Sequence, residues 1–191
     1  MKQTRYKLFA AVLITAACAW AGPPLICRDF EIGNAKSLPW KNGTDWHGAD
    51  PKYDVSHLTE DTLALLTPST PIRVRMETMR RAAIYATQDA GLADEIASRL
   101  LARAVGTADS LALFDAGYFV ETLRQATFVY RYNMLSPAER TAWKIRGDQA
   151  SMDGYPWVQK AIQMGGKDMD YAAGLMTEFR NEDLRISTAK R

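Results

Sequence analysis

The stretch TPIRVRMETMRRAAIYA, residues 70–86, indicates the fold more clearly than any other part of this sequence. Thr70 is a residue type that caps helix N-termini, and Pro71 suits the first helical position because no backbone donor is needed there. Apolar side chains then recur at helical spacing along one stripe: Ile72, Met76, Met79, Ala83 and Ala86. Such a stripe predicts an amphipathic helix that packs against a hydrophobic core.

The same helical pattern continues on both sides of this stretch. Further helices are expected over residues 58–66, 92–105, 110–132, 136–147, 155–164 and 169–179. The helix over 110–132 carries large apolar residues on two sides, which predicts that other helices enclose it. No run of residues alternates in the manner of a β-strand. The sequence therefore predicts an all-α fold, with antiparallel helical hairpins in a small α-solenoid or an irregular bundle.

Residues 22–57 differ from the rest because prolines and glycines interrupt every helical period there. The segment also carries Phe30, Ile32 and Trp40, so we expect an extended, loop-rich arm that packs on the helical body. The short helix over residues 58–66 is expected to receive it. The helical domain is expected over residues 58–180, and residues 181–191 as a polar, frayed tail.

The first 21 residues have the pattern of a signal peptide. Three basic residues within the first seven positions precede an apolar run that ends in Ala19-Trp-Ala21, a small-x-small cleavage site. The run is too short to cross a bilayer, and no later segment is more apolar, so no membrane span is expected in the mature chain. We expect an exported protein of bacterial type, periplasmic or extracellular. Cys18 offers an alternative in which the chain is retained as a lipoprotein.

Charge and cysteine content narrow the classes of partner. The chain has 24 Lys and Arg against 22 Asp and Glu, and three of the basic residues lie in the leader, which leaves 21 against 22 and a mature charge of −1. This balance provides no basic surface, so no nucleic-acid partner is expected. After cleavage Cys27 is the remaining cysteine and has no partner for an intramolecular disulfide.

Residues 27–40 read C-x-x-x-x-I-G-x-A-x-S-L-P-W and resemble the opening of a group of uncharacterised exported proteins from environmental bacteria. The resemblance continues through residues 54–81 and 111–123. It implies export and a helical body, and it carries over no catalytic or binding residue.

Residues 85–104 are also similar to a tetratricopeptide unit. Ala97, Leu101 and Ala104 have the small-large-small spacing of its second helix. The linking turn is longer than in that repeat and its characteristic glycine is absent. The similarity therefore implies repeat-like packing and not a repeat array.

The candidate catalytic or metal-binding residues lie in the arm around His47. Asp45 or Asp50 could orient the imidazole as a general base, or could share a metal with it. The alternative is that the aspartates form turns and cap the next helix while His47 lies at the surface. The sequence has no metal-ligand spacing, nucleophile motif or phosphate-binding glycine loop, so it predicts no metal and no cofactor.

Aromatic side chains give a second kind of candidate. Trp40 and Trp46 flank a polar loop and could contact sugar rings or peptide side chains. Packing is the alternative for both, and it is the expectation for Trp143 and Trp157, which have apolar neighbours at helical spacing.

The charged residues of the predicted helices are expected to be structural. Asp115 and Glu121 lie about 120° apart around one helix and do not face each other. Glu121 is expected to pair with Arg124, and Asp115 with Arg131 or Lys144. The arginines at positions 73, 75, 80 and 81 are expected to form a solvated basic face.

These observations favour a non-catalytic module that contacts a protein partner through a helical surface. The alternative is a small exported hydrolase or glycan-binding protein with a site near residues 40–54, in which His47 acts with Asp45 or Asp50. The sequence leaves open which of these two functions the chain has.

Overall fold

The structure, a computed structural model, describes residues 22–41, 45–106, 108–145 and 151–189. Its helices are α1 (Pro24–Cys27), α2 (Leu58–Leu65), α3 (Ile72–Ala86), α4 (Ala90–Ala104), α5 (Ser110–Arg131), α6 (Pro137–Ala142), α7 (Tyr155–Gln163) and α8 (Asp170–Ala189), with two 3₁₀ turns, η1 (Asp45–Gly48) and η2 (Val55–His57). Extended pairing within the described ranges is confined to an isolated antiparallel bridge between Trp40 and Ala49. The predicted all-α class is confirmed.

The predicted leader, with its cleavage site and Cys18, lies outside the described residues. Among the helices that the structure does describe, none combines the length and the apolar character that crossing a membrane requires.

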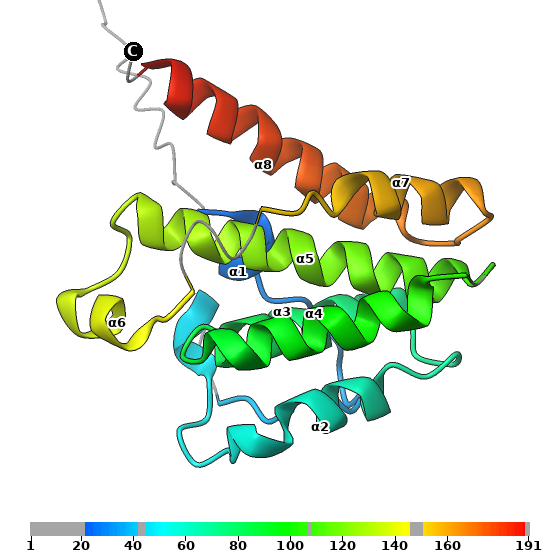
Figure 1. The fold of residues 1–191 in the computed structure, drawn as a ribbon, viewed down its shortest axis with the longest axis horizontal. Coiled ribbons are helices and arrows are strands. Elements are labelled where there is room, and N and C mark those ends of the chain that lie inside the picture. Colours follow the sequence, from blue (N-terminus) through cyan, green and yellow to red (C-terminus); the bar gives the residue numbers. More distant parts are fainter. Residues whose placement is uncertain (1–21, 42–44, 107, 146–150, 190–191) are drawn as a thin grey trace, which may run out of the picture.

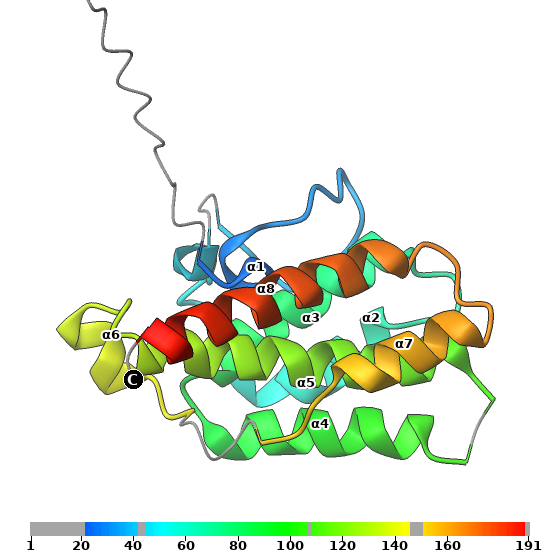
Figure 2. The ribbon, with the colours of Figure 1, turned by 90° about the horizontal axis from the view of Figure 1, so that it is seen from above.

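The helix α5 is the centre of the molecule. It contacts α3, α4 and α7, and also α1 and α8 from opposite ends of the described chain. Figure 1 shows α5 between α8 and the pair of α3 and α4, with α2 beyond that pair, and Figure 2 shows from above that α3 and α4 lie on opposite sides of α5. A linear stack would restrict α5 to its sequence neighbours, so the arrangement is an irregular bundle. Burial on both sides of α5 confirms that it is enclosed.

The helix α3 is more deeply buried than its amphipathic pattern predicts. Pro71, and not Thr70, is its N-cap, and the Thr70 hydroxyl instead donates to the Leu65 carbonyl at 2.7 Å. The predicted stripe packs inward, but Arg75 and Arg80 on the other faces are also among the largest fully buried side chains. The expectation of a solvated basic face is therefore wrong for these two arginines, because the arm and α5 cover them.

The arm, residues 22–57, is laid across the body and is not continuously extended. It contains α1, η1 and η2, and Leu25, Phe30 and Leu38 are buried in the core. The contacts of α1 are with α3, α5 and α8. The arm therefore docks mainly on these three helices, and not on the short helix α2 as expected. Tyr53 makes a contact with α2, where its hydroxyl donates to Asp61 at 2.7 Å.

The C-terminal helix is longer than the sequence pattern suggests. We expected it to end at residue 179, with a frayed tail from residue 181, but α8 continues to Ala189. An ion pair between Asp183 and Arg124 of α5, 3.9 Å apart, and one between Glu182 and Arg185 help to hold the extension. No proline interrupts this helix, which allows the polar residues to continue it.

The helix α6 begins as predicted and ends early. Its capping box, formed by Ser136 and Glu139, is present in full. The helix stops at Ala142, before Gly147, and Trp143 then turns into the core with 5% of its surface exposed. The core position predicted for Trp143 is confirmed.

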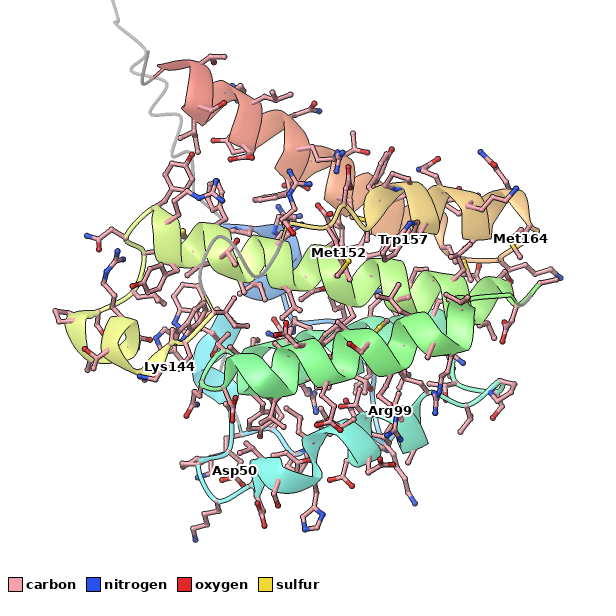
Figure 3. All side chains as sticks on the ribbon, viewed as in Figure 1. Asp50, Arg99, Lys144, Met152, Trp157 and Met164 are labelled. Atoms are coloured by element: carbon pink, nitrogen blue, oxygen red, sulfur yellow. The ribbon has the colours of Figure 1, made fainter. Side chains whose placement is uncertain are left out.

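The helices α5 and α7 cross at two glycines. A Cβ atom on Gly154 would lie 1.9 Å from the Gly117 carbonyl oxygen, and one on Gly117 would lie 2.6 Å from the Gly154 carbonyl oxygen. The absence of side chains therefore permits the close approach of the two backbones. Trp157 lies between α7 and α5 beside this crossing, half-buried and packed against the core (Figure 3).

Candidate functional site

The predicted histidine lies in η1, where it is held between two carboxylates. The ring nitrogen Nδ1 of His47 contacts Asp45 Oδ1, and Nε2 lies 3.0 Å from Glu139 Oε1 of α6. The same Asp45 oxygen accepts the backbone N–H of His47 at 2.9 Å. Each ring nitrogen of His47 therefore lies beside a carboxylate oxygen. For Nε2 to accept a proton from a substrate, Glu139 would have to move away first.

Glu139 joins this site to the aromatic side chains. Its Oε1 also accepts the indole N–H of Trp46 at 2.8 Å. Partial burial raises the pKa of Glu139, but hydrogen bonds from Ser136 and Trp46 outweigh it, so the pKa lies below its ordinary value. Sequence reasoning identified Glu139 only as a helix cap, because no local spacing relates it to His47.

Asp50 does not join His47. Its carboxylate lies 3.2 Å from Lys41 Nζ, and its backbone N–H donates to the Tyr85 hydroxyl at 2.9 Å. A hydrogen bond from the Lys52 backbone lowers the pKa of Asp50, and Lys41 adds to this effect. Figure 3 shows Asp50 on the side of the molecule that carries α2. Of the two predicted aspartates, only Asp45 is placed to orient the imidazole.

Both candidate tryptophans contact other side chains of the protein. Trp40 is half-buried and meets the Tyr85 ring edge-on, with ring centroids 6.0 Å apart. The guanidinium carbons of Arg80 and Arg81 lie 4.8 and 5.4 Å from the Trp40 ring centroid, within the range of cation–π attraction. Trp46 meets Trp143 edge-on at 6.3 Å. These contacts favour a packing role for both rings.

Three charged residues of α3, Glu77, Arg80 and Arg81, form a buried group that we call the Glu77 cluster. The Glu77 carboxylate accepts from Arg80 through two bonds of 2.8 Å and from Arg81 Nε at 2.7 Å. It also accepts the Phe30 backbone N–H at 3.1 Å. Because the cluster is saturated with internal hydrogen bonds, we interpret it as structural.

The arginines of the Glu77 cluster also hold the arm through its backbone. Arg80 Nη1 donates to the carbonyls of Ile26 and Asp45, at 3.2 and 2.8 Å. Arg81 Nη1 donates to the Leu38 carbonyl at 2.7 Å. Carbonyl groups that would otherwise be buried without partners are thereby satisfied.

Two acids of α5 are buried at separate places. Asp115 Oδ2 pairs with Arg75, and its Oδ1 has no hydrogen-bond partner among the described residues. Burial raises the pKa of Asp115 to about 7, although Arg75 acts in the opposite direction. Glu121 pairs with Arg124 at 3.3 Å as predicted, and burial raises its pKa too. Asp115 pairs with neither Arg131 nor Lys144, since the fold brings Arg75 to it instead.

The one cysteine among the described residues is Cys27, which is not in a disulfide. Cys27 is partly exposed at the end of α1, but burial raises the pKa of its thiol to about 12. The thiolate, which is the nucleophilic form, is then scarce.

An open cleft lies where α3 and α8 begin, and sequence reasoning did not identify it. Its volume is about 480 Å³, and it is lined by Pro71, Ile72, Arg73, Met76, Asp168, Asp170 and Tyr171. Figure 2 shows the starts of α3 and α8 at the same end of the molecule. We call this feature the α3–α8 cleft. The two segments are far apart in the sequence, so no local pattern could have joined them.

An aromatic side chain stands at the edge of the α3–α8 cleft. Tyr171 is 49% exposed, and its ring meets Phe30 of the arm edge-on at 6.3 Å. The guanidinium carbon of Arg73 lies 5.2 Å from the Tyr171 ring centroid. Exposed Pro71 and half-buried Ile72 supply apolar surface, and Met76 lies buried beneath them. The cleft thus combines apolar surface with charged groups at its edge.

Within the described ranges, no group of three or more His, Cys, Asp or Glu side chains has the geometry to hold a metal ion. Comparison of the chain with protein-family models, with curated proteins and with solved structures finds no match. The resemblance of residues 27–40 to exported bacterial proteins therefore stays a prediction.

Proposed function

We propose that this chain is an exported, non-catalytic module that binds a segment of a protein partner in the α3–α8 cleft. One observation carries the proposal: a guanidinium stacked on a half-exposed tyrosine, Arg73 on Tyr171, at the edge of an open cleft with apolar surface. Tyrosine and arginine are among the residue types enriched where proteins meet.

The size of the cleft agrees with the binding of a few side chains. A volume of about 480 Å³ lies within the usual range for ligand sites, about 300 to 1,000 Å³. The cleft is open to solvent, so a longer chain can cross it while inserting one or two side chains. The binding of an apolar side chain there would remove part of Tyr171 and Ile72 from water, which is favourable.

The test is a selection of random short peptides, displayed on phage, against the purified full-length protein. We expect enriched peptides to bind with micromolar affinity and to shift NMR signals of Ile72, Met76 and Tyr171. Tyr171→Ala should weaken that binding about tenfold, as expected when an exposed aromatic contact is lost. Leu184→Ala is the matched control, because Leu184 is an exposed apolar residue of the same helix outside the cleft.

Two results would contradict the proposal. One is the absence of any enriched peptide whose binding depends on Tyr171. The other is a set of shifted signals confined to residues 40–54, which would favour the hydrolase or glycan-binding alternative near His47.

A further inference from the structure

The charges of the α3–α8 cleft indicate which kind of segment it would receive, and this inference rests on the proposed function. Arg73, Asp168 and Asp170 all line the cleft. Within the described part of the chain, none of these three side chains forms an ion pair, whereas the exposed Glu60 and Glu178 each pair with an arginine. The cleft therefore presents three charges without ion-pair partners, of which Asp170 lies in the first turn of α8, where the helix dipole favours a carboxylate.

These charges are unequal. Two carboxylates face one guanidinium, and the positive charge of Arg73 is already directed at the Tyr171 ring. Three exposed charges lie near the cleft without lining it: Asp29 and Glu31 flank Phe30, which touches Tyr171, and Lys167 precedes Asp168. Together they add one net negative charge. The surroundings of Tyr171 therefore favour a positively charged group.

The apolar part of the cleft sets the second requirement. Pro71 is the N-cap of α3 and Ile72 is its first residue, whereas Asp168 precedes α8 and Asp170 is the first residue of α8. Met76, which also lines the cleft, is buried beneath its apolar side. A ligand that satisfies both sides needs an apolar side chain directed at α3 and a cation directed at α8.

We propose that the α3–α8 cleft binds a partner segment in which a lysine or arginine lies next to a large apolar residue such as leucine or phenylalanine. The apolar side chain lies on Pro71 and Ile72, and the cation lies between Asp168 and Asp170. Tyr171 provides an aromatic face to the aliphatic part of the basic side chain.

The experiment uses two synthetic peptides with blocked ends, Gly-Ser-Leu-Lys-Phe-Lys-Leu-Ser-Gly and the same peptide with glutamate in place of both lysines. Isothermal titration calorimetry with the full chain measures their affinities. We expect the lysine peptide to bind at least about tenfold more tightly, and its binding to weaken as salt rises from about 0.05 to about 0.5 M.

Substitutions locate the effect. The double variant Asp168→Asn, Asp170→Asn should lose about tenfold in affinity for the lysine peptide, as expected for two exposed ion pairs. Asparagine suits position 168, because Asp168 has a φ of +62°, which asparagine tolerates. The double variant Asp94→Asn, Glu95→Gln removes two exposed acids from α4, outside the cleft, and should leave the affinity unchanged. Circular dichroism verifies that each variant is folded.

The outcomes separate this inference from the proposed function. If both peptides bind equally and Tyr171→Ala weakens both, the cleft binds segments but the preference for a basic residue is wrong. The inference is also overturned if the glutamate peptide binds more tightly than the lysine peptide, or if neither peptide binds. In each case the phage selection still tests the proposed function, because it assumes nothing about the charge of the ligand.

Discussion

Glu77 and Arg80, three residues apart on α3, form a two-bond ion pair in which both side chains are completely buried. The pair lies where the arm crosses α3, and it bonds to backbone atoms of Phe30 and Ile26. Two residues that would be expected at the surface of an isolated helix thus form part of the interior. The arm thus buries a face of α3 that would be exposed to solvent in its absence.

Removing the charge of Glu77 should destabilise the whole domain. Glu77→Gln leaves Arg80 buried without a counter-charge, and loss of one partner of a buried pair costs about 3–5 kcal/mol. Urea unfolding followed by far-UV circular dichroism measures the change in the free energy of unfolding. Glu60→Gln is the matched control, because the pair of Glu60 with Arg99 is exposed and should contribute less than about 1 kcal/mol. Equal effects of the two variants would show that the Glu77 cluster is not structural.

Trp40→Ala tests whether the arm is held by packing. Trp40 is half-buried against Tyr85, Arg80 and Arg81, so we expect a loss of about 2–3 kcal/mol, below the range for a fully buried tryptophan. The same urea experiment applies. An unchanged midpoint and slope would mean that Trp40 is free to contact a ligand instead.

His47→Ala should have little effect on stability. The His47 side chain is 60% exposed, and its contacts with Asp45 and Glu139 lie at the surface, where such pairs contribute less than about 1 kcal/mol. Thermal unfolding of the variant verifies this. A hydrolytic activity that is found in the wild type and disappears in the folded variant would replace the binding proposal with the enzyme alternative.

Asp115 should make stability depend on pH. Its pKa rises from 3.8 to about 7 on folding, so between these values the folded state binds more protons than the unfolded chain. Stability from this group is therefore present below about pH 4 and falls as pH rises towards 7, by a few kcal/mol. The measurement is the free energy of unfolding of wild type minus that of Asp115→Asn, across this range. The free energy of unfolding of the wild type should fall relative to that of Asp115→Asn as pH rises, and a constant difference would contradict the prediction.

Replacement by alanine should have opposite effects at two glycines, Gly154 at the crossing of α5 and α7 and Gly174 inside α8. Gly154→Ala would place a methyl group against the Gly117 carbonyl, so we expect a loss of about 2–3 kcal/mol. Gly174→Ala meets no atom within 4 Å and lies inside α8, where alanine should stabilise by up to about 1 kcal/mol. Melting temperatures of the two variants should therefore move in opposite directions. A fall in both would show that α8 also needs its glycine.

Features that depend on near neighbours could be predicted from the sequence. The capping box of Ser136 and Glu139 and the pair of Glu121 with Arg124 each span three residues, and both are present. Helical spacing alone also predicts the all-α class. These features are local because a helix satisfies its own backbone hydrogen bonds within one turn.

Features that depend on the arrangement of helices could not be predicted. Arg75 meets Asp115 across forty positions, and the α3–α8 cleft joins the starts of two helices that are far apart in the chain. A charged residue on a helix is predicted to be exposed unless the segment that covers it is known. This explains why Arg75 and Arg80 were wrongly predicted to lie on a solvated face. The same reason hid the contact between His47 and Glu139, since only the folded arm brings η1 to α6.

The contact of α1 with α8 also constrains how the chain folds. Arg28 at the end of α1 pairs with Glu178, and Leu25 is sealed in a core that includes Met176. During synthesis, the side of α1 that contacts α8 therefore stays uncovered until α8 has been made. Such long-range closure slows folding and leaves apolar surface open in the meantime. Truncation before α8 would expose one side of α1, so this part of the fold is completed only when α1 and α8 have met.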